Sequence, residues 1–451
     1  MSTLRERLMR LGAAGRTAGG DVSARPAERD HGTTVSDATG ICGTSPEPGG
    51  AMREVGWRAL GAAEARNEWG AFLLRRQAYS SGHRHGRHRL GDLEWTLPLL
   101  APVTERQNRR APDLSARPPG AEAVLFLDLE TTGLGVGTGN FPFLIGLAYM
   151  ESGIFRVEQL FIRHPGEEPA ALAHLLDRLQ GRTHLATFNG RAFDWPLLVT
   201  RFVLNGWRPS GDGPFHLDLL PPARALWRYA LASCRLSNIG EHRLGVERED
   251  DIPGALAPTF YFRYLEDGDP AHVAGVLAHN ERDLLTLASL AVHLGRLAGG
   301  MAEPEETAEW TAAELLGAAA WLDAHGRSEQ ADPLYREIAA RDEPGMFRWL
   351  MAAAERWRRL GRFDEAVPLW EKAAAIAERS AVPVPDAHIR LAVYYEHRRK
   401  DPAAALVYAE RAFRLTAALP LSRGSSRAPR EREEIRRRVE RLRRKLAASR
   451  D

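Results

Sequence analysis

Two carboxylates at alternate positions of an apolar segment are the residues of this sequence best suited to chemistry. Asp128 and Glu130 lie in VLFLDLETTG, residues 124–133. Because residues two apart in a β-strand point to the same face, both carboxylates should project side by side from the end of a strand. Two close anions repel each other unless a cation lies between them, and all-oxygen ligands favour Mg²⁺ or Mn²⁺.

The surroundings of this pair matter more than its spacing. The chain has 59 acidic residues among 451, so composition alone predicts about eight acidic pairs at this spacing. Most such pairs lie on solvated helix faces, whereas this one interrupts a strand that should be buried on both sides. The sequence therefore predicts a metal site; the alternative is a strand end that reaches solvent.

A third carboxylate follows a later strand. In TFNGRAFDWPLL, residues 187–198, the predicted strand ends at Asn189 and Gly190, and Asp194 lies at the start of the next helix. Ligands of such sheets bind in the crevice beyond the strand ends, which makes Asp194 a candidate ligand. The alternative is that Asp194 caps its helix, where carboxylates are favoured.

A fourth carboxylate lies on a long predicted helix. In LAHNERDLLTLASL, residues 277–290, His279 and Asp283 are four residues apart and so share one helix face. Leucines beside them form an apolar stripe, so this helix should pack on the sheet, and a charge at its border needs a partner. The alternative partner for Asp283 is the neighbouring Arg282.

The elements that must position these residues indicate a mixed α/β sheet. Two strands flank the turn residues Glu151, Ser152 and Gly153 and predict a hairpin. The predicted strands cover residues 124–129, 143–150, 154–161 and 184–188, and the predicted helices cover residues 169–179, 192–204 and 271–297.

After about residue 307 the strands disappear and a helical repeat begins. Small and apolar residues recur at intervals of 35 and then 39 residues: Leu315, Leu350 and Ile389; Ala318, Ala353 and Ala392; Ala331, Ala366 and Ala405; Leu334, Leu369 and Tyr408. The clearest copy, RWRRLGRFDEAVPLWEKAAA, resembles a tetratricopeptide repeat. A plain helical bundle is the alternative, and a protein partner could bind the repeats.

We expect five regions: a disordered segment (1–50), an extension and linker (51–120), the sheet domain (121–300), the helical repeats (308–418) and a basic helical tail (419–451). The extension contains SGHRHGRHRL with His83, His85 and His88. Because histidines flanked by arginines attract cations poorly, this segment is interpreted as a solvated or phosphate-facing loop, with a metal site as the alternative.

Composition narrows the class of protein. The net charge is +2, and 58 of the 61 basic residues are arginine, a bias spread along the whole chain. Two cysteines provide neither a disulfide framework nor a zinc cluster, which favours a reducing compartment. The N-terminus has no signal-peptide pattern and no apolar run is long enough to span a membrane. We therefore expect a cytoplasmic protein.

The four carboxylates together resemble the acidic motifs of the DEDD exonucleases, which have the ribonuclease H-like fold. Asp128 and Glu130 match the first motif, Asp194 the second and Asp283 the third. NGRAFDWP is also similar to the second motif of the exonuclease domain in family B DNA polymerases. The closest likeness is to the YprB-like group of predicted exonucleases with C-terminal tetratricopeptide repeats, through GLGVGTGNFPFLIG, HLDLLPPARALWR, SCRLSNIGEHRLGV and the HRHG segment.

This resemblance implies a 3′→5′ exonuclease that uses two Mg²⁺ or Mn²⁺ ions. Asp128 would bridge both ions, Glu130 and Asp283 would complete one, and Asp194 would hold the other. His279 would accept a proton from the attacking water, although three residues separate it from Asp283, as in the tyrosine subclass of the family.

The substrate-binding candidates are Thr131, Thr132 and Asn189, beside the terminal nucleotide. DNA and RNA are both candidate substrates because they share the phosphodiester. The alternatives are a structure-specific endonuclease and a non-catalytic scaffold, in which the repeats hold a protein and the nuclease fold grips nucleic acid.

Overall fold

The computed structural model describes residues 56–109, 118–133, 139–207, 213–249, 251–301, 307–343, 345–380, 384–418 and 427–448. The predicted disordered segment, residues 1–50, lies outside these ranges. The chain divides into two compact units, Met1–Ala223 with Ser233–Gly299, and Arg224–Ala232 with Gly300–Asp451.

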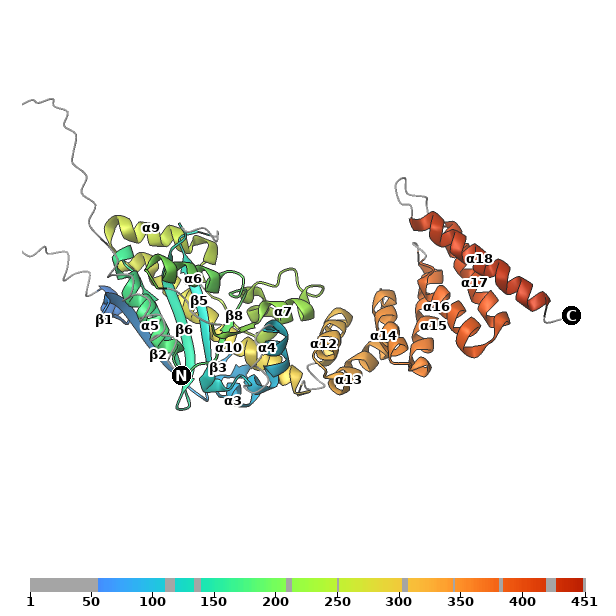
Figure 1. Cartoon of the computed structure of the whole chain (residues 1–451), viewed down its shortest axis with the longest axis horizontal. Coiled ribbons are helices and arrows are strands. Elements are labelled where there is room, and N and C mark those ends of the chain that lie inside the picture. The colour runs from blue at the N-terminus through green and yellow to red at the C-terminus, as the bar shows by residue number, and fades with distance from the viewer. Residues whose placement is uncertain are drawn as a thin grey trace, which may run out of the picture. The chain divides into compact units, whose positions relative to one another are not determined.

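A seven-stranded mixed sheet forms the centre of the described part of the first unit, in the order β1-β2-β7-β6-β5-β8-β9. Its strands are β1 (Ala62–Asn67), β2 (Gly70–Ser80), β5 (Val124–Thr131), β6 (Pro142–Glu151), β7 (Ile154–Phe161), β8 (His184–Thr187) and β9 (Phe215–Asp218). Strands β5, β8 and β9 run parallel, and the other neighbours are antiparallel. Helices flank this sheet, which confirms the predicted fold class (Figure 1).

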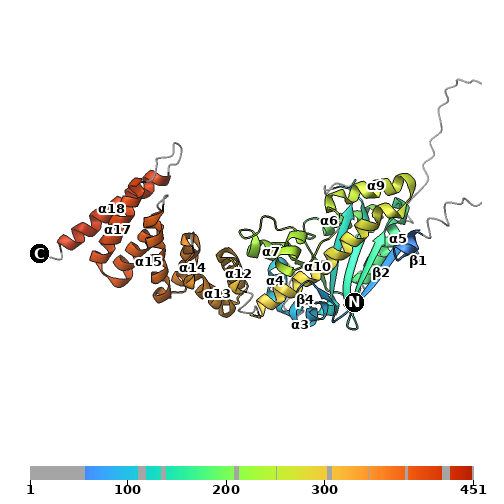
Figure 2. The ribbon, with the colours of Figure 1, turned by 180° about the vertical axis from the view of Figure 1, so that it is seen from behind.

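Helices cover both faces of the sheet. Figure 1 shows α5 (Glu168–Leu179) and α6 (Asp194–Leu204) in front of it, and Figure 2 shows α10 (Ala274–Ala298) across the opposite face. The further helices of this unit are α3 (Leu93–Thr96), α4 (Ala101–Gln107), α7 (Leu220–Trp227), α8 (Leu236–Ile239) and α9 (Ala257–Asp267); α7 continues into the second unit.

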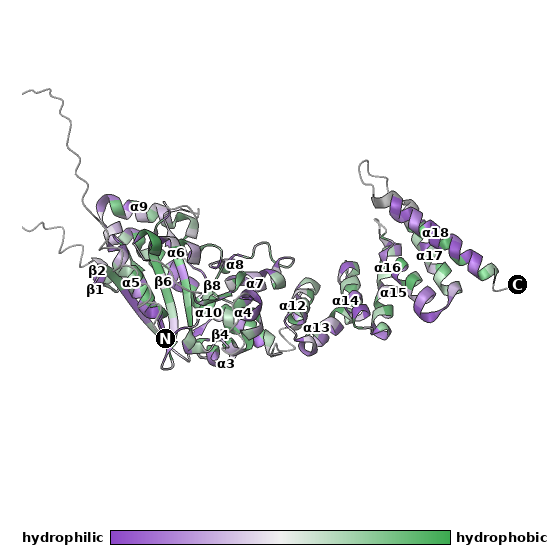
Figure 3. Cartoon of the chain, in the orientation of Figure 1, coloured by the Kyte–Doolittle hydropathy of each residue, from purple (hydrophilic) through white to green (hydrophobic). Residues whose placement is uncertain are grey.

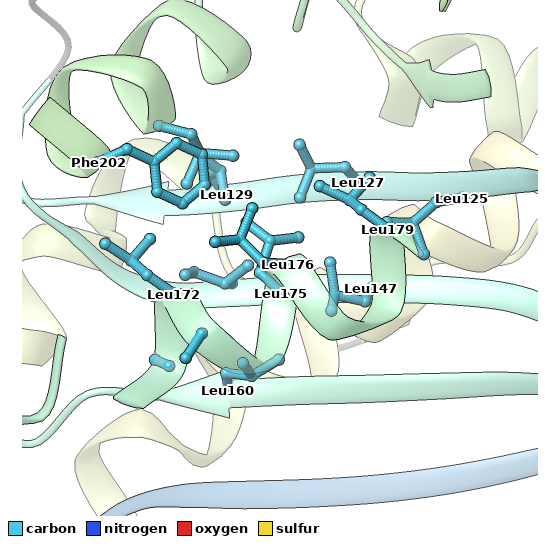
Figure 4. Close-up of a cluster of buried hydrophobic side chains, with 14 of the residues drawn as sticks. Leu125, Leu127, Leu129, Leu147, Leu160, Leu172, Leu175, Leu176, Leu179 and Phe202 are labelled. Atoms are coloured by element: carbon cyan, nitrogen blue, oxygen red, sulfur yellow. The ribbon is translucent and has the colours of Figure 1, made fainter. Parts of the chain in front are cut away.

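The alternation of side chains along β5 decides which way its carboxylates point. Leu125, Leu127 and Leu129 are buried in a core with leucines of α5 and with Phe202 of α6 (Figure 4). Because successive residues of a strand point to opposite faces, Asp128 and Glu130 face the α10 side. The central strands are largely hydrophobic, as expected for strands covered on both faces (Figure 3).

The sheet extends further than the sequence indicated. The segment 51–120 was expected to precede the sheet domain, whereas its strands β1 and β2 pair with each other and then with β7. Many residues of both strands are exposed, and these polar residues hide the strand pattern in the sequence. Strand β9, at the other end of the sheet, was also missed.

The HRHG segment is packed rather than solvated. It forms the hairpin β3 (Arg84–His85) and β4 (His88–Arg89) against α10, where His85 Nε2 lies 3.0 Å from Thr286 Oγ1 and His88 Nε2 lies 3.2 Å from His293 Nδ1. Burial lowers the pKa of both His85 and His88 to about 4. The expectation of a solvated or phosphate-facing loop is therefore wrong for these two histidines.

The second unit is helical throughout its described residues. Its helices are α12 (Ala312–Ala324), α13 (Ser328–Ala340), α14 (Phe347–Arg359), α15 (Phe363–Arg379), α16 (Asp386–Tyr394), α17 (Pro402–Ala418) and α18 (Arg427–Ala447). The recurring alanines Ala318, Ala353 and Ala392 are all buried. This all-helical region was predicted; its assignment to the tetratricopeptide repeats stays a prediction.

Helix α18 is not simply an exposed basic helix. Its apolar residues Val439 and Leu442 pack against Ala405 and Ala409 of α17. On the same side, Arg441 donates to the Glu396 carboxylate at 2.7 Å. The helix therefore packs on α17 with one face, while most of its other residues are hydrophilic (Figure 3).

A prediction concerns the turn of the HRHG hairpin. Gly86 has φ +62°, and a Cβ there would overlap the carbonyl oxygen of Leu244. We expect Gly86→Ala to lower the Tm by roughly 4–8 °C, because the methyl group adds a clash to the backbone strain. Gly153 is the matched control, since it has φ +75° and open space around a Cβ. Equal losses in thermal unfolding for Gly86→Ala and Gly153→Ala would contradict this packing.

Candidate active site

The end of β5 is shaped by its pairing with β6. Asp128 lies opposite Gly146, and the register shifts between Glu130 and Thr131. Such a bulge bends a strand and redirects its last side chains. Glu130 keeps only 9% of its surface exposed, and its carboxylate has no hydrogen-bond or ion-pair partner among the described residues.

Asn280 of α10 holds Asp128 in place. Its Nδ2 donates to Asp128 Oδ2 at 2.8 Å, and its Oδ1 accepts from Gln159 Nε2 of β7 at 2.9 Å. A Cβ on Gly146 would overlap the Asn280 amide. Glycine opposite Asp128 therefore leaves the space through which α10 reaches the strand.

The support for Asn280 continues to the edge of the sheet. Arg75 of β2 donates to Gln159 Oε1 at 2.6 Å and pairs with Glu281 of α10 at 2.6 Å. Tyr79 of β2 also donates to Glu281. Strand β2, which lies outside the predicted sheet domain, thus fixes the same turn of α10 that contacts Asp128.

Asp194 is the first residue of α6 but not its cap. The N-cap position belongs to Phe193, and no side chain caps this helix. A Cβ on Gly190 would lie 2.6 Å from Asp194 Oδ2, so glycine is needed for the carboxylate to fold back toward the end of β8. Burial and the charge of Asp218 raise the pKa of Asp194 to about 7. The capping alternative is therefore excluded.

Asp218 at the end of β9 orders the loop that precedes α6. Its Oδ1 accepts the backbone N–H of Asn189 at 2.8 Å and that of Leu220 at 3.0 Å, and its Oδ2 faces the N–H of Arg191 at 3.4 Å. Asn189 has φ +73°, a left-handed conformation that asparagine tolerates. Asp218 is thus a structural carboxylate that shapes the approach to Asp194.

His279 and Asp283 lie in a network with a partner that the sequence did not indicate. Arg248 donates to Asp283 through Nη2 and pairs with Asp251 through Nη1 at 2.6 Å. His279 Nδ1 lies 2.8 Å from Asp251 Oδ1, and His279 Nε2 lies 3.6 Å from Asp283 Oδ2. Arg282, the expected local partner of Asp283, pairs instead with Asp251 at 2.7 Å.

The carboxylates of β5, α6 and α10 act on one another electrostatically. Burial raises the pKa of Asp128 well above its ordinary value, and the charges of Asp283 and Asp194 raise it further. Burial and the same neighbours, with Asp128, also raise the pKa of Glu130. Three elements therefore bring four negative charges within reach of each other, at a cost that a bound cation would remove.

The four carboxylates converge without forming a closed metal cage. Among the described residues, no three His, Cys, Asp or Glu side chains lie close enough together to hold one ion. Asp283 is engaged by Arg248, and Asp128 by Asn280. The donor chemistry still suits a hard divalent cation, because every candidate ligand is a carboxylate oxygen and two of them, on Glu130 and Asp194, have no cationic partner among the described residues.

The candidate substrate-binding residues border the same strand ends. Thr131 Oγ1 donates to the Gly133 carbonyl at 2.7 Å, and Thr132 Oγ1 accepts from the Phe141 N–H at 3.1 Å. These bonds order the turn after β5. The glycine-rich residues 134–138, which follow it, lie outside the described ranges.

Four polar residues of the site were missed from sequence: Asn280, Asp251, Arg248 and Asp218. Asn280 directly follows His279, and a buried amide beside a candidate base was a usable signal. Asp251 and Arg248 lie in an irregular segment that carries no periodic pattern. Only the folding of that segment onto α10 identifies them.

Comparison with known proteins gives two matches to this chain. Residues 125–295 match the RNase_H superfamily, so the matched segment contains all four carboxylates. The chain is also 32% identical over 395 residues to the uncharacterized protein YprB of Bacillus subtilis (strain 168), covering 87% of this chain and 90% of that protein. The chain belongs to the YprB family.

Membership in the YprB family confirms the resemblance seen in the sequence motifs. The superfamily match supports a nuclease-type hydrolase that binds nucleic acid and depends on divalent metal. In the described parts of this YprB family member, no helix is both long and apolar enough to cross a membrane.

A prediction follows from the raised pKa of Asp194. The folded protein resists ionisation of the Asp194 carboxyl. The free energy of unfolding therefore falls as the pH rises from the pKa of this group in the unfolded chain, about 3.8, to its pKa in the folded protein, about 7. In EDTA at pH 8, we expect Asp194→Asn to raise the Tm by roughly 2–6 °C, and at pH 4 to change it little.

Asp218→Ala is the matched control for this prediction. Its carboxylate accepts backbone N–H groups, so its loss should lower the Tm at pH 8. A Tm for Asp194→Asn that is lower than the wild-type value at pH 8 would show that Asp194 is a stabilising group.

Proposed function

We propose that this protein is a metal-dependent nuclease that removes nucleotides from the 3′ end of a nucleic-acid strand. The observation that carries this proposal is the convergence of Asp128, Glu130, Asp194 and Asp283 from three elements, with raised pKa values for the first three. Clustered buried carboxylates without enough cations destabilise a fold, which favours a site selected for ligand binding.

The residues that would hold metal are the four carboxylates. When bound, two Mg²⁺ or Mn²⁺ ions would acidify a water molecule and offset the charge of the cleaved phosphodiester. For Asp283 to join such a site, its carboxylate must release the Arg248 guanidinium from Oδ1 or bind metal through Oδ2. Asp128 is already oriented by Asn280, which leaves its second oxygen free to bind.

His279 is suited to accept a proton at Nε2. Asp251 faces Nδ1 at 2.8 Å, and a carboxylate at that position holds the proton on Nδ1 in the neutral imidazole. Nε2 then carries the lone pair on the Asp283 side of the ring, 3.6 Å from Asp283 Oδ2. The short spacing between His279 and Asp283 is thus compatible with a general base held by a second carboxylate.

Binding of the terminal nucleotide would use the turn after β5 and the loop before α6. Thr131 and Thr132 lie on the first, and Asn189 on the second. The backbone groups of both segments border the carboxylates. We propose that they position the sugar and phosphate of the last nucleotide.

The first test is hydrolysis by the purified full chain with Mn²⁺ or Mg²⁺. A 5′-labelled single strand should shorten progressively, and Asp128→Asn should reduce the rate by at least about 100-fold because the metals lose a shared ligand. Glu94→Gln, on an exposed position of α3, should retain the wild-type rate. Cleavage of a circular single strand, which has no ends, would point to an endonuclease, and equal rates for Asp128→Asn and wild type would refute the assignment.

A second prediction separates the proton acceptor from the metal ligands. His279→Ala should lower kcat by about 10²–10⁴-fold, the usual contribution of a general base, while calorimetric titration still detects Mn²⁺ binding. Asp283→Asn should lower kcat and also weaken Mn²⁺ binding. If His279→Ala loses Mn²⁺ binding as well, the imidazole is a ligand rather than a base.

A further inference from the structure

A basic hollow lies next to Asp194, bordered by the end of α4, the loop before α6 and strand β9. Its volume is about 570 Å³, within the usual range of about 300–1,000 Å³ for ligand sites. Its cations come from Arg106, Arg109 and Arg191. Among the described residues, no aspartate or glutamate lines it, although acidic residues are nearly as numerous as basic ones in the chain.

Another hollow of this unit provides a contrast. It lies near β1 and α9 and is lined by arginines such as Arg58, but also by the acidic residues Glu64, Glu266 and Asp267. Arginine is abundant throughout this protein, so its presence alone does not indicate a phosphate site. The hollow beside Asp194 differs because its positive charge is not offset by acidic residues in the lining.

The arginines of α4 are held against β9 by two side-chain amides. Gln107 donates to the Asp218 carbonyl at 2.7 Å and accepts from its N–H at 2.8 Å. Asn108 makes the same two bonds to His216, at 2.8 and 2.9 Å. These amides occupy the free edge of β9 and place Arg106 and Arg109 on either side of the docked residues.

Aromatic rings line the hollow beside the arginines. Trp195 follows Asp194 directly and is only partly buried. Gly213 lies against this ring, where a Cβ would be 3.2 Å from Trp195 Cζ2. Burial and the charge of Arg191 lower the pKa of His216 to about 4, so at neutral pH the positive charge of the hollow comes from the arginines.

We propose that this hollow binds the single strand of the nucleic-acid substrate close to the scissile end. Arg109 and Arg191 would contact phosphates, and Trp195 would stack on a base. Neighbouring base pairs cover the faces of a base inside a duplex, so stacking on Trp195 away from the strand end favours a single strand over a duplex. The proposal names the substrate of the nuclease site and rests on the proposed function.

Continuity with the carboxylates supports this role. Asp194 and Trp195 are neighbours on α6, and Asp218 fixes both the backbone of Asn189 and the docking of α4. A strand lying in the hollow would therefore lie beside the start of the helix that carries Asp194. Arg191 acts electrostatically on the Asp218 carboxylate, but neither Arg191 nor Arg109 forms an ion pair with a described residue.

The test is binding of a fluorescein-labelled dT12 or rU12 strand by anisotropy, in EDTA. The double variant Arg109→Ala with Arg191→Ala should bind at least about 10-fold more weakly, and the slope of log K against log salt should fall by about 1.4, as for two lost phosphate contacts. Arg58→Ala, in the contrasting hollow, should bind as the wild type does.

Trp195 provides an independent variant. Trp195→Ala should weaken binding of the single strand by about 5- to 100-fold, and Trp195→Phe, which keeps an aromatic face, should restore most of it. Thermal unfolding of both variants shows whether the fold survives. Unchanged affinity in the double arginine variant would overturn the proposal. So would a 12-base-pair duplex that binds as tightly as the single strand and whose affinity Trp195→Ala does not change.

Hydrolysis of a minimal phosphodiester separates this proposal from the nuclease assignment. The p-nitrophenyl ester of thymidine 5′-monophosphate is too short to fill the hollow, so its hydrolysis by the wild type with Mn²⁺ reports on the carboxylates without requiring a strand in the hollow. Asp128→Asn should lose this hydrolysis and still bind the single strand in EDTA. Binding that depends on Arg109 and Arg191 without any hydrolysis would support the hollow and refute the nuclease.

Discussion

Repulsion among buried carboxylates is the constraint on which the first unit depends. Asp128, Glu130, Asp194 and Asp283 come from β5, α6 and α10, and burial raises the pKa of the first three, so each additional charge there is costly. The fold tolerates this cost because other elements hold the carboxylates in place: Asn280 binds Asp128, and Arg248 neutralises Asp283. A site of this kind gains stability when cations enter, which couples metal binding to the order of the strand ends.

The residues before residue 121 contribute more than a linker. Strand β2 brings Arg75 to Gln159 and Glu281, and so supports the turn of α10 that carries Asn280. Helix α4 closes the edge of β9 through Gln107 and Asn108. The first contact supports Asn280, which binds Asp128, and the second holds Asp218, which orders the loop before Asp194. The extension therefore completes the sheet and shapes the approach to the site.

Much of the central fold could be predicted, because its elements are long and strongly patterned. The strand before Asp128, the hairpin around Gly153 and the helix of Asp283 all lie where the periodicity placed them. Strands β1, β2 and β9 could not be predicted, since they are short or half exposed and gain their register from neighbours. The HRHG histidines were misjudged because their basic neighbours point outward while the rings pack on α10.

The sequence by itself determined the fold class and indicated the four carboxylates as candidates, because strand and helix periodicity fix which residues share a face. Only the tertiary structure decided their partners. Arg248 and Asp251 reach α10 from an irregular segment, and Gly146 matters solely because Asn280 crosses above it. The local sequence pattern determines which face of its own helix or strand a side chain occupies. The electrostatic environment of that side chain depends on which distant elements pack beside it, and packing is a property of the whole fold.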